Sequence, residues 1–122
     1  MAGLGTAAAI AVGISQVAYL GAMVTLGVRL ALLARRTRQL PEVLLAAHFL
    51  LCCTLGYAFQ GSGHALAIDS DASRPLVVTL LSIGHGASVL GVASVLAFNY
   101  WVFRRGTRLG QWLLAGGIAW LV

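Results

Sequence analysis

Long apolar runs separated by short polar stretches dominate the chain. The four runs cover residues 4–34, 40–59, 76–103 and 111–122. A helix needs roughly 20 apolar residues to cross a bilayer, so each of the first three runs is long enough to span. The pattern predicts an all-α fold, a polytopic transmembrane helical bundle with up-and-down topology that forms a single transmembrane domain over residues 1–122.

The last run is too short to cross a membrane. Its 12 residues, 111–122, would cover about 18 Å of a hydrocarbon core roughly 30 Å thick. A re-entrant or interfacial segment is the less favoured interpretation, because this run lacks the polar face of an interfacial helix. We therefore expect three full spans plus a truncated fourth, as the N-terminal portion of a longer bundle.

Composition supports a membrane protein and excludes a soluble domain. Hydrophobic residues make up 60% of the chain and charged residues only 9%, against about 25% in soluble domains. The net charge of +5 does not indicate a nucleic-acid partner, because the basic residues are interleaved with apolar runs. All eight basic residues are arginines, which hints at a GC-rich bacterial genome. We expect the inner (plasma) membrane of a bacterium.

The arginines predict an orientation. Three lie in the stretch 35–39 and three in 104–110, whereas the stretch 60–74 holds Asp69, Asp71 and one arginine. The first and third loops of such a chain lie on the same side, which the positive-inside rule makes cytoplasmic. The N-terminus and loop 60–74 are then outside. The residues that set this topology are Arg35, Arg36, Arg38, Arg104, Arg105 and Arg108.

Local signals agree with these boundaries. Pro41 and Glu42 suit the first turn of the second helix, and Pro75 suits the first turn of the third. Tyr100 and Trp101 precede the second arginine cluster, where an aromatic belt anchors a helix at the cytoplasmic interface.

The third run carries small residues at four-residue intervals, which let helices approach closely in lipid. These candidate packing residues are Ser82, Gly84, Gly86, Ser88 and Gly91. The third helix is therefore expected at the centre of the bundle. In the first run, Gln16 is a polar group inside the membrane and should find a hydrogen-bond partner on a neighbouring helix. Arg29 is expected to snorkel towards the cytoplasmic headgroups, the alternative being a charge that faces an internal cavity.

Histidines are the main candidates for chemistry. His48 and His85 lie at similar depths on sequential helices, so two facing imidazoles could ligate a b-type haem, which small residues beside His85 would accommodate. The alternative is that both are packing and hydrogen-bonding residues. His64 is expected in a solvated loop near Asp69 and Asp71, a weak case for a metal site.

Other chemistry finds little support. The vicinal Cys52 and Cys53 should point about 100° apart on a helix and serve as packing residues. We find no nucleotide-binding loop, nucleophile elbow or zinc-protease signature, so an enzyme is not expected. The three acidic residues all lie at the membrane edges, so a transporter would need further segments to supply an intramembrane carboxylate.

The stretch RRTRQLPEVLLAAHFLLCCTLGYAF resembles multi-pass bacterial membrane proteins of unknown function with about seven helices. The residues that carry the resemblance are Arg35, Arg36, Arg38, Leu40, Pro41, Glu42, Gly56 and Tyr57. It covers roughly a fifth of the chain. The resemblance implies that the chain is the first part of a longer bundle, and it implies no functional residue.

The sequence thus predicts an integral inner-membrane protein with a sensory, scaffold or small-molecule-binding role. The alternatives are a b-type membrane cytochrome that uses His48 and His85, and a fragment of a transporter. The expected partners are the lipid bilayer and either further helices of a longer chain or a second copy.

Overall fold

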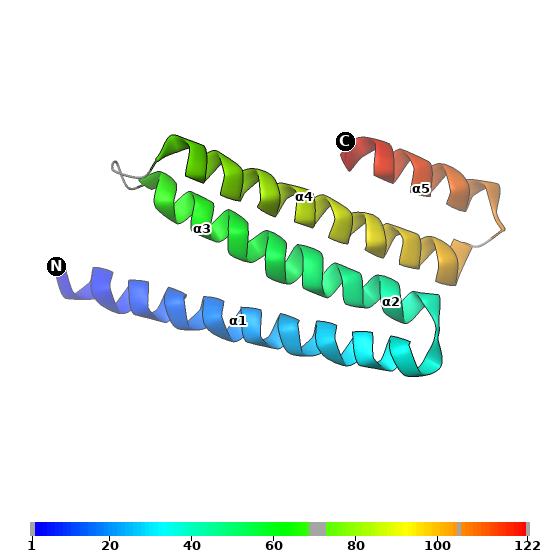
Figure 1. Cartoon of the computed structure of the whole chain (residues 1–122), viewed down its shortest axis with the longest axis horizontal. Helices are drawn as coiled ribbons and strands as arrows, with labels where there is room; N and C mark the ends of the chain where they lie inside the picture. The colour runs from blue at the N-terminus through cyan, green and yellow to red at the C-terminus, as the bar shows by residue number, and fades with distance from the viewer. Residues whose placement is uncertain (1, 69–72, 105, 122) are drawn as a thin grey trace.

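The chain forms helices joined by short turns in the computed structural model, which describes residues 2–68, 73–104 and 106–121. The elements are α1 (Ala2–Thr37), α2 (Leu40–Ala47), η1 (His48–Gly56), α3 (Tyr57–Ile68), α4 (Arg74–Asn99), η2 (Tyr100–Arg104) and α5 (Arg108–Leu121). The segments η1 and η2 are π-helical. Helices α2, η1 and α3 form one continuous second helix, and α4 continues into η2 as the third (Figure 1). The predicted all-helical fold is confirmed.

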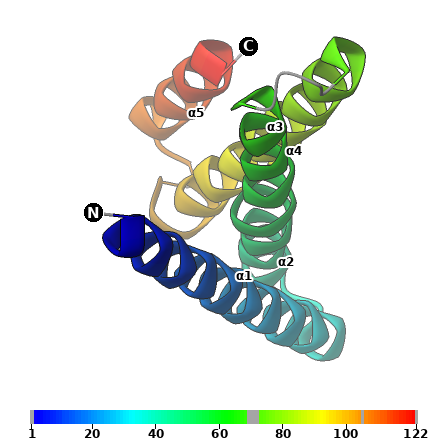
Figure 2. The ribbon, with the colours of Figure 1, turned by 90° about the vertical axis from the view of Figure 1, so that its left-hand side faces the viewer.

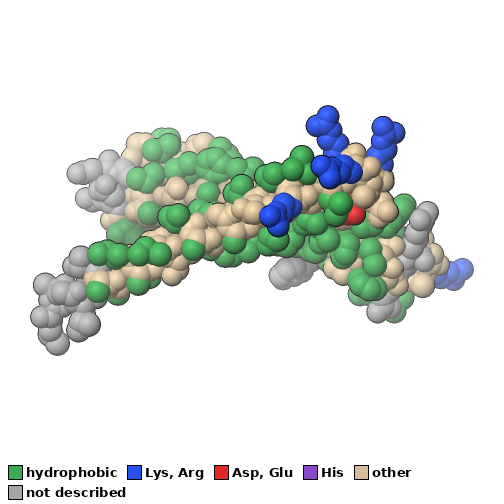
Figure 3. Space-filling model, turned by 90° about the horizontal axis from the view of Figure 1, so that it is seen from below, with side chains coloured by type: hydrophobic (Ala, Val, Ile, Leu, Met, Phe, Trp, Pro, Cys, Tyr) green, Lys and Arg blue, Asp and Glu red, His purple; other side chains and the backbone are tan. Residues whose placement is uncertain are grey.

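Three helices are long and apolar enough to cross a membrane, as predicted: Ala7–Thr37, Leu40–Ile68 and Arg74–Phe103. Of the described side chains, the buried apolar ones are only Ala34 and Ala46. A water-soluble bundle of this size would bury many large apolar side chains, whereas here they face outward. Figure 3 shows one such face, with hydrophobic side chains along the helices and arginines towards one end. The three apolar helices indicate a membrane location.

The second helix is longer than predicted. It continues to Ile68 instead of ending at Phe59, so most of the expected loop 60–74 is helical. The glycines of this stretch suggested a loop, but in a membrane helix a glycine also serves close packing. Gly63 is buried, and a methyl group added there would lie 2.8 Å from a side-chain carbon of Leu81 on α4.

The second helix, and not the third, lies at the centre of the bundle. It packs against α1 through α2 and η1, and against α4 through α2, η1 and α3. The views in Figures 1 and 2 both show α1 on one side of this helix and α4 on the other. The prediction was wrong because the small residues of the third helix meet a matching set on the second, which also contacts α1. Gly27 of α1, for example, faces Leu50.

The first turn, between α1 and α2, is closed by a left-handed residue. Arg38 has a φ of 54°, and its N–H donates to the carbonyl of Ala34 over 2.8 Å. This is the single-bond αL cap, in which glycine is usual. Thr37 donates from its hydroxyl to the carboxylate of Glu42, which links the end of α1 to the first turn of α2. Pro41 lies in that first turn, as predicted.

Helix α5 begins at Arg108, three residues earlier than predicted. The side-chain oxygen of Thr107 accepts a hydrogen bond from the Gly110 N–H over 3.1 Å, which is an N-cap. Gly106 precedes it with a φ of 86°, in the region that favours glycine. The helix has 14 residues and is about 21 Å long, shorter than a bilayer core.

Candidate functional site

The centre of the second helix is the nine-residue π-helix η1, His48–Gly56. In an α-helix, residues five apart point about 140° away from each other, whereas the wider turn of a π-helix, with its i→i+5 bonding, brings them towards the same face. Two side-chain contacts in η1 show this register. Thr54 donates from its hydroxyl to the Phe49 carbonyl over 2.9 Å, and His48 meets Cys53. Such π segments are frequent at functional sites.

His48 is held between two helices. Its Nδ1 lies 3.0 Å from the carbonyl oxygen of Gly91 on α4, and its Nε2 lies 3.6 Å from the Sγ of Cys53. Because a carbonyl only accepts, the Nδ1 carries a proton and donates it to Gly91, and the Nε2 is left facing the thiol. The ring therefore satisfies both nitrogens within the bundle, which accounts for a histidine at this depth.

The contact between the second helix and α4 depends on small residues. Gly84 and Gly91 are buried, and Gly56 opposes Ser88. Gln60 donates from Nε2 to the Ser88 hydroxyl over 3.2 Å, so a polar link accompanies the close packing. Three predicted packing residues, Gly84, Ser88 and Gly91, thus face the second helix.

The other two predicted packing residues are placed differently. Ser82 and Gly86 are exposed on another face of α4, and a methyl group on Gly86 would meet nothing within 4 Å. The contact follows positions 84, 88 and 91, one stripe of the helix, and positions 82 and 86 fall outside it.

A mainly apolar wedge with a few polar side chains lies between the N-terminal half of α1 and α3. We define it as two adjoining cavities that share Gln16 and Tyr57. The larger, about 640 Å³, is lined by Ala11, Val12, Ser15, Gln16, Tyr19 and Tyr57. The smaller, about 250 Å³, is lined by Gln16, Leu20, Tyr57, Ala58, Gly61, Ser62 and Ala65. Both views of the ribbon show α1 diverging from the second helix as it leaves the α1–α2 turn, which opens this space (Figures 1 and 2).

Two tyrosines join the wedge to η1. The rings of Tyr19 and Tyr57 pack with their centroids 5.0 Å apart at an interplanar angle of 56°. The Tyr19 side chain also lies beside the Cys53 thiol. The tyrosine pair, Cys53 and His48 therefore form a connected set of polar side chains, and its tyrosines also line the wedge with Gln16.

Gln16 itself does not find the partner that the sequence led us to expect. Its side chain is exposed, and in the described part of the chain its amide makes no hydrogen bond to another residue. Ser15 beside it donates to the carbonyl of Ala11 over 2.8 Å and so satisfies its own hydroxyl proton. The amide of Gln16 is thus directed into the wedge with its hydrogen-bonding capacity unused.

The structure does not bring His48 and His85 together. The carbonyl that His48 contacts belongs to Gly91, six residues or about 9 Å along α4 from His85, and His85 is exposed. The two rings do not share a partner in this arrangement, so the haem hypothesis gains no support from it. His64 lies on α3, exposed, and not in a loop as predicted. Among the described residues, no three histidine, cysteine or acidic side chains gather to hold a metal ion.

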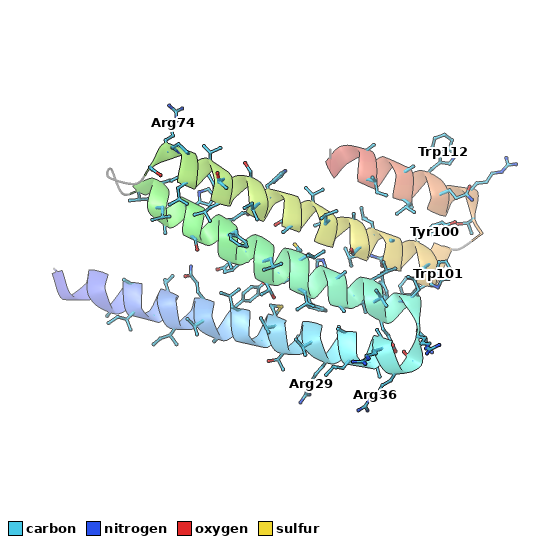
Figure 4. All side chains as sticks on the ribbon, viewed as in Figure 1. Arg29, Arg36, Arg74, Tyr100, Trp101 and Trp112 are labelled. Carbon is cyan, nitrogen blue, oxygen red and sulfur yellow. The ribbon has the colours of Figure 1, made fainter. Side chains whose placement is uncertain are left out.

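The predicted cytoplasmic anchor lies at the end of the third helix, in η2. Tyr100 and Phe103 line a cavity of about 450 Å³ with Asn99, Leu96 and three residues of α5. Trp101 and Tyr100 are partly exposed and flank the third helix near its end (Figure 4). Asp69, Asp71 and Arg105 lie outside the described residues, and so does the side chain of Arg104.

Sequence reasoning missed the roles of Cys53, Tyr19 and Tyr57. The signal available was the five-residue spacing of His48 and Cys53, which only a π-helix converts into a contact. Comparison with protein-family models, with curated proteins and with solved structures finds no match to this chain.

Proposed function

We propose that this chain is a multi-pass membrane protein whose bundle binds a small lipid-soluble molecule in the wedge between α1 and α3. The observation that carries the proposal is the Gln16 amide, which is exposed on a membrane helix without a protein hydrogen bond. An amide without partners costs on the order of 2 to 7 kcal/mol in hydrocarbon, and Gln16, about 32 Å before Thr37 on α1, lies about 5 Å inside the outer edge of the core, where part of this cost applies. A bound molecule with hydrogen-bonding groups would remove this cost.

The lining of the wedge suggests the chemical class. Gln16 offers both a donor and an acceptor, Tyr57 offers a hydroxyl, and the ring of Tyr57 supplies an aromatic face. The cavity volumes of about 640 and 250 Å³ suit a small ligand. A planar ring with carbonyl oxygens, such as a quinone head group, matches these groups and reaches the wedge from within the bilayer. The role is binding, in a sensory or scaffold protein, and not catalysis.

We further propose the orientation and the membrane. Arginines at the α1–α2 turn and around residues 104–108, against one arginine at residue 74, support a cytoplasmic position for loops 35–39 and 104–110. The N-terminus and the turn near residues 69–73 then face outward, in the inner membrane of a bacterium. Lipid is the immediate partner, and a second copy or further helices would be the competing occupants of the wedge.

Titration of the purified protein with decylubiquinone, followed by native mass spectrometry, tests the proposal. One bound quinone per chain is expected, with binding weakened by Gln16→Leu, which removes the amide, and by Tyr57→Phe, which removes only a hydroxyl. Val17→Leu is the matched control, because Val17 is 72% exposed beside Gln16 and lines neither cavity. Equal quinone binding by all three variants would exclude the wedge as the binding site. If the parent chain forms a dimer that Gln16→Leu dissociates, the occupant of the wedge is a second copy of the chain.

A further inference from the structure

Two arginines lie on one outward face of α1. Arg29 and Arg36 are seven residues apart, which places them within about 20° of the same direction and about 10 Å apart along the helix. Arg29 follows the buried Gly27 by two positions, and Arg36 follows the buried Ala34 by two. Two positions correspond to a rotation of about 200° around the helix axis. Both therefore point away from the second helix, as Figure 4 shows.

The two side chains frame a shallow apolar cavity. It has a volume of about 210 Å³ and is lined by Arg29, Leu32, Leu33 and Arg36. Leu32 and Leu33 are 55% and 44% exposed, so an apolar surface separates the two guanidinium groups. The site thus combines two positive charges with a strip suited to a hydrocarbon chain.

The described part of the chain supplies no counter-charge for these arginines. Glu42 is the only acidic residue it contains, and that carboxylate accepts a hydrogen bond from Thr37. No ion pair is present for Arg29 or Arg36 among the described residues. Because an uncompensated charge at membrane depth is costly, an anion from outside the chain is expected there.

The depth of Arg29 selects the kind of anion. The second and third spans have 29 and 30 residues, about 44 and 45 Å, so each end projects about 7 Å beyond a centred core of roughly 30 Å. Arg29 precedes the end of α1 at Thr37 by eight residues, or about 12 Å. Its backbone then lies about 5 Å inside the core edge, within reach of the headgroups for a snorkelling arginine.

We propose that Arg29 and Arg36 together bind the phosphate of one anionic phospholipid, with an acyl chain of that lipid against Leu32 and Leu33. Guanidinium groups bind phosphate oxygens in a bidentate manner, which suits a phosphate held between two levels of the helix. An anionic headgroup is preferred to a zwitterionic one, because an ammonium group would add a third positive charge. A free phosphate ion has no apolar part for the leucine strip and does not enter the core. The site is separate from the wedge and goes beyond the proposed function.

Native mass spectrometry of the detergent-purified full chain tests this site with two probes, dioleoylphosphatidylglycerol and dioleoylphosphatidylcholine. Tighter binding of phosphatidylglycerol is expected. A juxtamembrane arginine contributes about five-fold in affinity for anionic lipid, so Arg29→Gln and Arg36→Gln should each weaken phosphatidylglycerol binding by about that factor. Two independent positions keep the test available if one variant does not fold.

Arg74→Gln is the matched control, because Arg74 is exposed at the other end of the bundle (Figure 4). It should leave phosphatidylglycerol binding unchanged, as should Gln16→Leu in the wedge. Equal binding of the two lipids, or equal losses in Arg29→Gln and Arg74→Gln, would overturn the proposal. It would also be overturned by a dimer that Arg29→Gln dissociates, since a partner carboxylate would then supply the anion.

Discussion

Replacing Gly91 by alanine tests the contact that holds η1 against α4. The added methyl group would lie 2.5 Å from the Cβ of Cys52, 2.6 Å from its backbone N and 2.9 Å from its Cα. Two of these are backbone atoms, so no side-chain rotation relieves the clash and α4 must move away. The 3.0 Å contact between His48 Nδ1 and the Gly91 carbonyl would then lengthen.

The magnitude follows from three contributions. Overpacking costs about 1 to 3 kcal/mol, and loss of the histidine hydrogen bond costs about 1 kcal/mol. Alanine offsets about 1 kcal/mol of this through its helix propensity. Gly86→Ala is the matched control, because its methyl group meets nothing within 4 Å and gains only the propensity contribution. The two variants should therefore differ by about 2 to 4 kcal/mol.

Reversible unfolding in mixed micelles, with increasing sodium dodecyl sulfate, measures this difference. Gly91→Ala should unfold at a lower detergent fraction than the parent, and Gly86→Ala at an equal or higher one. If the two variants agree within about 0.5 kcal/mol, the close contact between η1 and α4 does not exist as described.

Arg38→Gly should stabilise the protein by about 1 kcal/mol, because glycine adopts the left-handed backbone of this position without strain. Arg35→Gly removes the same charge from the interior of α1 and should destabilise the protein. The same unfolding assay compares the two variants. Gln60→Leu should lower the free energy of unfolding by about 0.6 to 1.7 kcal/mol, because it loses the hydrogen bond to Ser88 on α4. An unchanged free energy of unfolding would show that this hydrogen bond does not stabilise the bundle. In a cysteine-free background, a cysteine at Ser73 should react in intact cells with an impermeant maleimide and one at Thr107 should not; the reverse would invert the proposed orientation.

The three spans could be predicted because hydrophobicity over roughly 20 residues is a local property of the chain. The end of the second helix could not, because a glycine such as Gly63 favours a loop in water and close packing in lipid, and only the opposing Leu81 decides between the two. The central position of the second helix has the same origin. The central position depends on which glycines of neighbouring helices face each other, and the spacing of small residues within one helix does not predict this.

The candidate site was predicted only in part. Polar residues at membrane depth, His48 and Gln16, drew attention from sequence alone. The partner of His48 depends on η1, since an α-helical register would turn Cys53 about 140° away. The wedge depends on the divergence of α1 from α3, which is a tertiary property. The histidine pair suggested by equal depths failed for a similar reason, because depth alone does not fix the direction in which His85 points.

The most direct test of the ligand site is the occupancy of the wedge in protein taken from its own membrane, with no probe added. Native mass spectrometry of gently extracted protein should show a bound small molecule, distinguished from a phospholipid by its mass, on the parent chain and on Val17→Leu. Gln16→Leu should lose it, while Arg29→Gln should keep it. A parent chain without such a molecule, or equal retention by Gln16→Leu, would contradict a ligand site between α1 and α3.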